Sequence, residues 1–297
     1  MAIRRIAVEE AFVTPEIMKE WHVVLAGRNV EPGFAKMGET ILAATPGNKL
    51  MDDRLLDIGA KRIAHMDSIG IDMQILSLTS PGVQVFEASL ATRLAAASND
   101  ALAEAVRAYP TRFAGLAAIA PQDPTAAARE IERAAQELKL NGLIVNSHTM
   151  GEYLDAEKFW PILEAAQALD MPIYLHPREP AASWVAPYLD YGLWFAGWGF
   201  AAETGLHALR LILSGTFDRY PKLKIVLGHM GEGPAVLASA HRQPLFARSE
   251  DRCRRQASQA AESVAEAVRF MDGAAVTEDE RKQIYATNAR RVFKLKA

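Results

Sequence analysis

Residues 113–145, FAGLAAIAPQDPTAAAREIERAAQELKLNGLIV, decide the fold. An apolar run, FAGLAAIA (113–120), leads through a turn into a segment whose apolar residues recur every three or four positions. A second apolar run, LNGLIV (140–145), follows. The recurrence is typical of an amphipathic helix, and continuous apolar runs are typical of strands buried on both faces. The stretch therefore predicts a strand–helix–strand unit with parallel strands.

The same alternation extends over most of the chain. Because no Gly-rich phosphate loop follows the first apolar run, a (β/α) TIM-like barrel is favoured over an open, nucleotide-binding sheet. Residues 20–60 interrupt the alternation, and we expect them to form an inserted loop that covers a site at the strand ends. The further runs expected to be strands are IRRIAV (3–8), MQILSL (73–78), PIYL (172–175) and LKIVLG (223–228).

Length and composition restrict the possible classes of protein. The chain has 297 residues, half of them hydrophobic, which is enough for one barrel domain over 1–297. A net charge of −3 disfavours a nucleic-acid partner, and no apolar run approaches the roughly 20 residues that span a bilayer. The single cysteine, Cys253, cannot form an intramolecular disulfide, which favours a reducing compartment. We therefore expect a cytoplasmic protein.

Polar residues follow every expected strand. In a parallel barrel the carboxyl ends of the strands form the catalytic face, so these residues are candidates for a shared site. Any one of these polar residues could be an ordinary loop residue, but six strands in succession that end in polar residues are harder to explain in that way. The polar residues are Glu9–Glu10, Thr79–Pro81, Pro121–Asp123, Asn146–His148, His176–Arg178 and His229–Glu232.

Two roles remain open for each of the strongest candidates. A carboxylate such as Glu9 at the end of a buried strand is costly unless it binds a metal or pairs with an arginine such as Arg178. His176 precedes a proline, which would hold the imidazole in place as a metal ligand, although a lone buried histidine is more often a satisfied core residue. Glu232 could orient His229 as an acid/base pair, or could lie in the first turn of a helix.

Several segments together resemble the amidohydrolase-related decarboxylases, which include the 2,3-dihydroxybenzoate, γ-resorcylate and 5-carboxyvanillate decarboxylases. The resemblance covers roughly residues 3–233 and 262–295, and its most specific parts are the HPR and GHMGE segments in this order. The segments that carry it are IAVEEAF (6–12), LTSPGVQ (78–84), RFAGLAAIAPQDP (112–124), IVNSHTMGEYLD (144–155), YLHPREP (174–180), FAAETG…GHMGEG (200–233) and TNARRVFKL (287–295).

The resemblance implies a distorted (β/α)₈ barrel that binds one divalent ion, Zn²⁺ or Mn²⁺, and releases CO₂ from a hydroxylated aromatic acid. It makes Glu9 and His176 metal ligands, and His229 with Glu232 the catalytic pair. It also implies a homo-oligomer, a dimer or tetramer. The substrate-binding residues that we expect are Phe12, Asn146 and Trp198. Phe12 and Trp198 would offer a ring face to an aromatic acid, and core packing is an equally open role for both.

The sequence departs from this family after Gly233. Residues 234–261 contain no β-rich run, and the family's metal-binding aspartate of the eighth strand is not found. We therefore expect a barrel that is incomplete at its C-terminal end, with 234–261 an aberrant segment caused by a deletion or a sequence artefact. Three functions follow: the decarboxylase, an amidohydrolase or lactonase using the same site, and an inactive truncated relative. The later aspartates are Asp251, Asp272 and Asp279.

Overall fold

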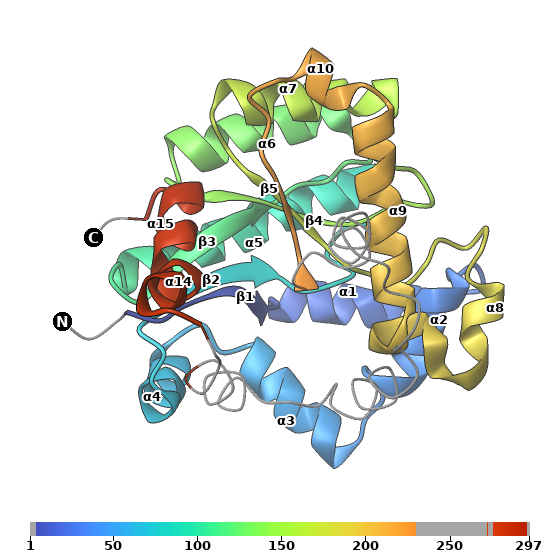
Figure 1. The fold of residues 1–297 in the computed structure, drawn as a ribbon. Helices are drawn as coiled ribbons and strands as arrows, with labels where there is room; N and C mark the ends of the chain where they lie inside the picture. Colours follow the sequence, from blue (N-terminus) through green and yellow to red (C-terminus); the bar gives the residue numbers. More distant parts are fainter. Residues whose placement is uncertain (1–3, 230–271, 273–275, 296–297) are drawn as a thin grey trace, which may run out of the picture.

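A computed structural model describes residues 4–229, 272 and 276–295 of the chain. Six parallel strands form one sheet in sequence order, and the sheet curls into a half-barrel (Figure 1). Each strand lies beside its sequence neighbour, and every neighbouring pair is parallel. The strands are β1 (Ile6–Phe12), β2 (Met73–Leu78), β3 (Phe113–Ala118), β4 (Gly142–Asn146), β5 (Ile173–His176) and β6 (Ile225–Leu227).

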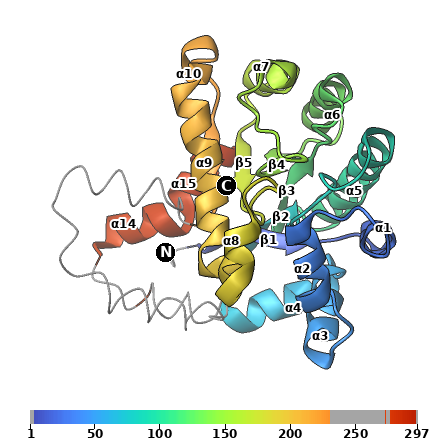
Figure 2. The same cartoon turned by 90° about the vertical axis from the view of Figure 1, so that its right-hand side faces the viewer.

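Helices α5, α6 and α7 follow one another around the outside of the curled sheet, and α9 continues the arc (Figure 2). Near the C-terminus, α15 lies beside the amino end of β4, where Asn141 Nδ2 donates to the carbonyl of Phe293. The helices before β3 are α1 (Pro15–Leu25), α2 (Pro32–Thr40), α3 (Pro46–Leu55), α4 (Ala60–Ile69) and α5 (Ala88–Ala108). Those after β3 are α6 (Pro124–Gln136), η1 (Glu157–Phe159), α7 (Trp160–Ala168), α8 (Ala186–Leu189), η2 (Asp190–Gly192), η3 (Leu193–Gly197), α9 (Gly199–Leu213), α10 (Thr216–Arg219), α14 (Glu278–Lys282), η5 (Gln283–Thr287) and α15 (Asn288–Phe293).

Local sequence fixes where several helices begin. The side chains of Thr14 and Asp123 accept hydrogen bonds from the first-turn amides of α1 and α6, and a proline follows each of them. A capping oxygen satisfies an amide that has no partner within the helix, and proline at the first position has the helical φ already set. These signals start the helices beside the strand ends, so the loops between strand and helix stay short.

The expected strands agree with the observed ones to within a few residues, and the expected α/β barrel architecture is confirmed. The expectation of a loop over residues 20–60 was wrong in one respect, because the region contains α2 and α3. Pro32 and Pro46 start these helices, and Thr45 caps α3 by accepting a hydrogen bond from the amide of Asn48. The segment is therefore structured and packs against the strand ends.

The core lies between the sheet and its helices. Every residue of β2, β3 and β4 is buried, as expected for parallel strands that are covered on both faces. At Gly115 a Cβ atom would lie 2.9 Å from side-chain atoms of Leu102 and Leu140, so the close approach of α5 to β3 requires glycine. This packing fixes the middle strands and leaves β1 and β6 at the two ends of the described sheet.

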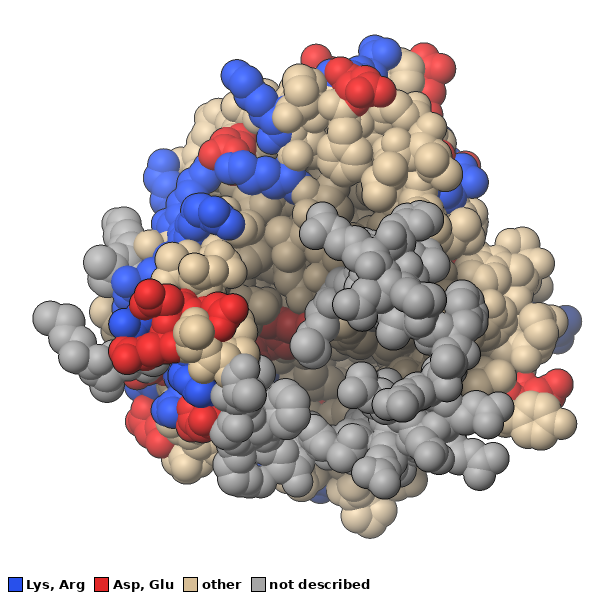
Figure 3. All heavy atoms as spheres, viewed as in Figure 1, with Lys and Arg blue, Asp and Glu red and all other residues tan. Residues whose placement is uncertain are grey.

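The described surface carries charges of both signs. On the face in Figure 3, acidic side chains gather over α14, with lysines and arginines nearby. Within the described residues, no helix is both long and apolar enough to cross a bilayer. Residues 234–261, the expected aberrant segment, lie outside the described part of the chain.

One buried side chain gives a test of this packing. Asn99 on α5 donates to the carbonyl of Ala118 (2.8 Å) and accepts from the amide of Ala118 (2.7 Å), which pairs the backbone at the end of β3. We expect Asn99→Ala to lower the free energy of unfolding by about 2–4 kcal/mol, because it leaves buried backbone groups unpaired. Urea unfolding measures the change.

The adjacent residue is a matched control. Asp100 is exposed and forms an ion pair with Arg133 at the surface. We expect Asp100→Ala to cost no more than about 1 kcal/mol, as is usual for an exposed ion pair. Equal losses in the two variants would contradict the structural role of Asn99.

Candidate metal centre

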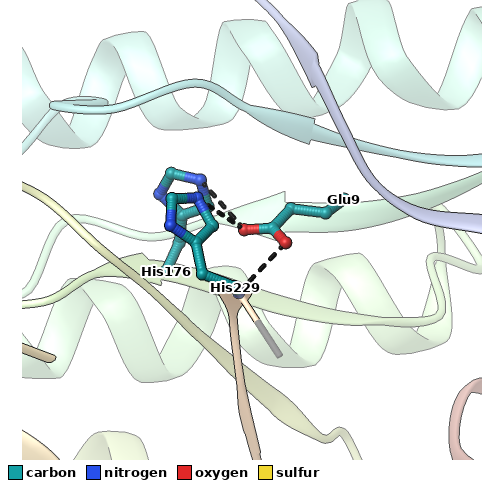
Figure 4. A group of neighbouring side chains, drawn as sticks. All are labelled: Glu9, His176 and His229. Atoms are coloured by element: carbon teal, nitrogen blue, oxygen red, sulfur yellow. Dashed lines mark hydrogen bonds and ion pairs between the residues drawn. The ribbon is translucent and has the colours of Figure 1, made fainter. Parts of the chain in front are cut away.

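Three side chains meet here, one from β1 and two from the carboxyl ends of β5 and β6 (Figure 4). Oε1 of Glu9 lies 3.4 Å from Nε2 of His176 and 3.2 Å from Nε2 of His229. The other carboxylate oxygen of Glu9 accepts a 3.1 Å hydrogen bond from the backbone N–H of His229. One ligand atom from each residue lies within 4.8 Å of the other two. Two imidazole nitrogens and a carboxylate oxygen are a common ligand set for a divalent metal in catalytic sites.

The backbone at the strand ends brings these groups together. His176 is the last residue of β5 and lies in register with Asn146 of β4. His229 follows β6 and has a positive φ of 43°. At Gly228, a Cβ atom would lie 3.1 Å from Oε1 of Glu9, so a larger residue there would crowd the carboxylate. His229 therefore supplies the imidazole, and Gly228 leaves room for the carboxylate beside it.

The electrostatics of the group fit a cation. Burial lowers the pKa of His176 to about 4, so its imidazole is neutral near pH 7, as a metal ligand must be. Glu9 Oε1 and His176 Nδ1 are buried and have no hydrogen-bond partner. A buried carboxylate oxygen close to a neutral imidazole is poorly compensated, and a divalent ion between them would compensate it.

The alternative partner for Glu9 is engaged elsewhere. Arg178 is fully buried and forms ion pairs with Glu31 (2.7 Å) and Glu179 (2.5 Å). It ties α2 to the segment after β5, because Glu31 directly precedes α2. Glu9 therefore belongs to the histidine cluster and not to an arginine pair.

Comparison with known proteins places this geometry in a family. The sequence pattern described as Amidohydrolase matches residues 46–250, more than half of the chain. The chain belongs to the amidohydrolase family, and the resemblance seen in the sequence is confirmed. A γ-resorcylate decarboxylase from Polaromonas sp. is 49% identical over 189 residues, which span 61% of this chain and 58% of that protein. One from Rhodococcus jostii is 40% identical over 248 residues, spanning 78% of this chain and 69% of that protein.

Solved structures of decarboxylases are also similar to this chain in fold. The 5-carboxyvanillate decarboxylase from Novosphingobium aromaticivorans, complexed with manganese and 4-hydroxy-3-methoxy-5-nitrobenzoic acid, has a TM-score of 0.88 and 36% identity. The match covers 99% of this chain and 97% of that one. A dihydroxybenzoic acid decarboxylase from Polaromonas sp. JS666, with bound manganese and 2-nitroresorcinol, has a TM-score of 0.81 and 33% identity, covering 100% and 98%. The expected divalent ion thus agrees both with the group at Glu9 and with metal-bound structures of the family.

The other expected site residues lie at different depths. Asn146 is buried, and its Oδ1 has no hydrogen-bond partner. Phe12, the last residue of β1, is buried in the core, whereas Trp198, just before α9, is 53% exposed. Glu232 lies outside the described residues. The structure thus brings Glu9, His176 and His229 together and places Asn146 in register beside one of them.

An aromatic residue at this site was not predicted from the sequence. Phe200 lies in the first turn of α9, and its ring centroid is 5.7 Å from that of the His229 imidazole. The ring centroid of Phe195 is 4.4 Å from that of Phe200. The segment FAAETG carried part of the family resemblance, but nothing in its spacing marks the phenylalanine as a site residue. Its role depends on how α9 crosses the strand ends.

A buried polar network holds α9 in that place. On α9, Glu203 accepts hydrogen bonds from Ser147 (3.1 Å), Tyr153 (3.3 Å) and the backbone amide of Ala181 (3.1 Å). His207, one turn further on, accepts a hydrogen bond from the amide of Leu154 at Nε2. The network fastens the middle of α9 to the loops after β4 and β5, which fixes the position of Phe200.

Serine, histidine and glutamate lie together in this network, yet they are not arranged as a nucleophilic triad. Because Nε2 of His207 accepts a hydrogen bond, the neutral imidazole carries its proton on Nδ1, which points at Ser147 Oγ (3.3 Å). The serine hydroxyl donates to Glu203, so no base is placed to remove its proton by way of the histidine. Ser147 is also fully buried. The group is structural.

The two described aspartates of the C-terminal segment lie outside the metal group. Asp272 forms an ion pair with Arg5 (2.9 Å) and accepts a hydrogen bond from Tyr285 (2.7 Å). Arg5 precedes β1, whereas Glu9 lies in the middle of that strand. Asp279 lies on α14, and its carboxylate is exposed. Neither of them replaces the family's eighth-strand ligand.

The first prediction for the site concerns metal binding. We expect the purified chain to bind Mn²⁺, and His176→Ala to weaken binding by at least about 100-fold, because it removes one of the two residues that would hold the ion. Titration followed by the electron paramagnetic resonance signal of free Mn²⁺ measures the affinity. The matched control is His65→Ala, at an exposed position on α4, which should bind like the wild type. Equal affinity in the two variants would rule out this ligand assignment.

The second prediction concerns pH and the network on α9. Burial raises the pKa of Glu203 to about 7, from an ordinary value of 4.5. Between these two values the unfolded chain loses the proton while the folded chain keeps it, so stability falls as pH rises from about 4.5 to 7. The loss attributable to Glu203 is about 3 kcal/mol.

Glu203→Gln tests this dependence, because an amide of the same shape does not titrate. Between pH 5 and pH 8 we expect the wild type to lose about 3 kcal/mol more unfolding free energy than Glu203→Gln. The control is Glu157→Gln, at an exposed position in η1, which should retain the wild-type dependence. An unaltered pH dependence in Glu203→Gln would contradict the assigned protonation.

Proposed function

We propose that this chain catalyses the metal-dependent, non-oxidative decarboxylation of a hydroxylated aromatic carboxylic acid. The observation that carries the proposal is the convergence of Glu9, His176 and His229 at the rim of an amidohydrolase barrel. The decarboxylases among its relatives, and the manganese in structures of that family, support it.

The reaction needs a held substrate and a delivered proton. A proton adds to the ring carbon that bears the carboxylate, and the C–C bond then breaks, so that its electron pair restores the aromatic ring and CO₂ leaves. Glu9 and His176 would hold the divalent ion, which supplies positive charge to fix the carboxylate and an adjacent hydroxyl of the substrate. No oxidant enters, because the ring carbon gains a proton and loses CO₂.

We assign proton delivery to His229, with Glu232 as its carboxylate partner. Nε2 of His229 lies at the edge of the metal group, 3.2 Å from Glu9, and its side chain is 36% exposed. An imidazole in such a place can exchange its proton with solvent between turnovers. Phe200 packs beside this imidazole, which gives an aromatic substrate a ring to contact.

The remaining substrate contacts are proposed from position. Asn146 lies in register beside His176, and its unpartnered buried oxygen is an acceptor for a substrate hydroxyl. Phe12 ends the strand that carries Glu9, and Trp198 lies two residues before Phe200. We propose Asn146, Phe12 and Trp198 as substrate contacts from these positions along the chain.

The test is turnover of a panel of phenolic acids with Mn²⁺ or Zn²⁺, including 2,6-dihydroxybenzoate, 2,3-dihydroxybenzoate and 5-carboxyvanillate. We expect at least one acid to lose CO₂, and chromatography of the phenol product measures the rate. His176→Ala should lower this rate by about 100-fold or more. The His65→Ala variant should keep the wild-type rate. Lactone or amide substrates in the same panel would reveal hydrolysis instead.

Two outcomes would overturn the proposal. Incorporation of water into a product with no release of CO₂ would make the chain a hydrolase. Binding of Mn²⁺ without turnover of any acid would make it an inactive relative.

Cellular context and assembly are also proposals. The single cysteine fits the reducing cytoplasm, and we propose that the protein acts there. We further propose a homodimer or homotetramer that acts on a small aromatic acid. Light scattering coupled to size-exclusion chromatography measures the mass of the assembly.

A further inference from the structure

Strand β1, which carries Glu9, has one more residue than the segment of β2 with which it pairs. Ala7 pairs with Gln74 and Glu10 pairs with Leu76, so three steps along β1 match two steps along β2. This is a β-bulge, in which two residues lie opposite one. It falls between Ala7 and Glu10 and therefore includes Glu9.

The bulge decides which of two consecutive carboxylates faces the metal group. In a regular ladder from Ala7, Glu9 would pair with Leu76 and would lie on the face that carries Gln74. In the structure Glu10 has that position, and Glu9 points to the opposite face, toward His176. Loss of the extra residue from the pairing would turn Glu9 away from the histidines.

Side chains behind the sheet hold the bulged segment. Nε2 of Gln74 donates a 2.7 Å hydrogen bond to Oε2 of Glu10. From α4, Arg62 donates to the carbonyl of Ala11 (2.7 Å), and its Nη1 lies 3.4 Å from Oε1 of Gln74. These contacts fix the two residues that follow Glu9.

Arg62 is itself held firmly. Its guanidinium also donates to the carbonyls of Arg54 (2.8 Å), at the end of α3, and Asp57 (2.6 Å), in the next turn. A cavity of about 960 Å³, lined by α3, α4 and the outer side of β1, lies next to this cross-link. Among the described residues, the outer side of β1 is therefore held here by hydrogen bonds more than by close packing.

We propose that Arg62 and Gln74 are positioning residues that lock the β1 bulge and thereby select Glu9, and not Glu10, as the carboxylate of the metal centre. The inference rests on the proposed metal function for its consequence, but its structural part can be measured without metal. Residues that orient metal ligands from behind typically change metal affinity by 10- to 100-fold when they are replaced.

The first experiment uses the metal-free protein. The backbone amide of His229 donates to Glu9 Oε2, so its hydrogen exchange reports whether Glu9 points inward. We expect Arg62→Met and Gln74→Leu to speed this exchange by about 10-fold or more, as Glu9→Ala should. Exchange at this amide that is unchanged in both variants would overturn the proposal.

The second experiment measures Mn²⁺ affinity in the same variants. We expect the dissociation constant to rise by about 10-fold or more in Arg62→Met. Asn99→Ala is the control for general destabilisation, because it weakens the fold at β3, away from β1. A similar loss of affinity in Asn99→Ala would attribute the effect to stability and would overturn the positioning role.

The two proposals fail separately. If the wild type bound no Mn²⁺ while Arg62→Met still lost protection at the His229 amide, the metal function would fall and the positioning of Glu9 would stand. If the wild type bound Mn²⁺ and neither variant changed exchange or affinity, the positioning role would fall and the metal centre would remain.

Discussion

The contact between Glu9 and His229 joins the first and the last described strands, 220 residues apart in sequence. The sheet must curl for β1 and β6 to approach each other, and the missing side chain at Gly228 leaves room for the carboxylate. Parallel strands deliver their carboxyl ends to one rim, so the curl alone gathers the polar residues that follow each strand. The arrangement concentrates a carboxylate and two imidazoles where a cation would compensate them.

The site is supported by polar contacts on both sides of the sheet. Behind β1, Arg62 and Gln74 hold the strand at its bulge. On the other side, Glu203 fastens α9, whose first turn places Phe200 beside His229. Such buried groups contribute little net stability when all of them are paired, but each becomes costly when a partner is lost. They therefore favour one geometry over its alternatives, which a site with a fixed ligand arrangement requires.

The described half-barrel has two end strands, and the chain matches only 58% of the length of its Polaromonas relative. A sheet edge exposes backbone groups that would otherwise be paired. At β1, Arg62 takes up one of these, the carbonyl of Ala11, with a side chain in place of a strand. The same interaction therefore covers part of an edge and orients a ligand.

The sequence by itself predicted the six strands and, through the family resemblance, named Glu9, His176 and His229 as candidates for one site. Continuous apolar runs and the polar residues that end them are local features, and parallel topology converts them into a shared rim. It also indicated that the barrel would lack its usual eighth-strand carboxylate. It did not predict α2 and α3 within the expected loop, although Pro32 and Pro46 were the signals for them.

Only the tertiary structure shows why Glu9, and not Glu10, faces the histidines. Alternation along a strand assigns faces only when the pairing with its neighbour is known, and one extra residue reverses the assignment. That pairing depends on Gln74 and Arg62, which lie more than 50 positions further along the chain. The place of Phe200 depends likewise on contacts of α9 with distant loops. Neither is visible in sequence, because each results from contacts that form only when separate elements pack together.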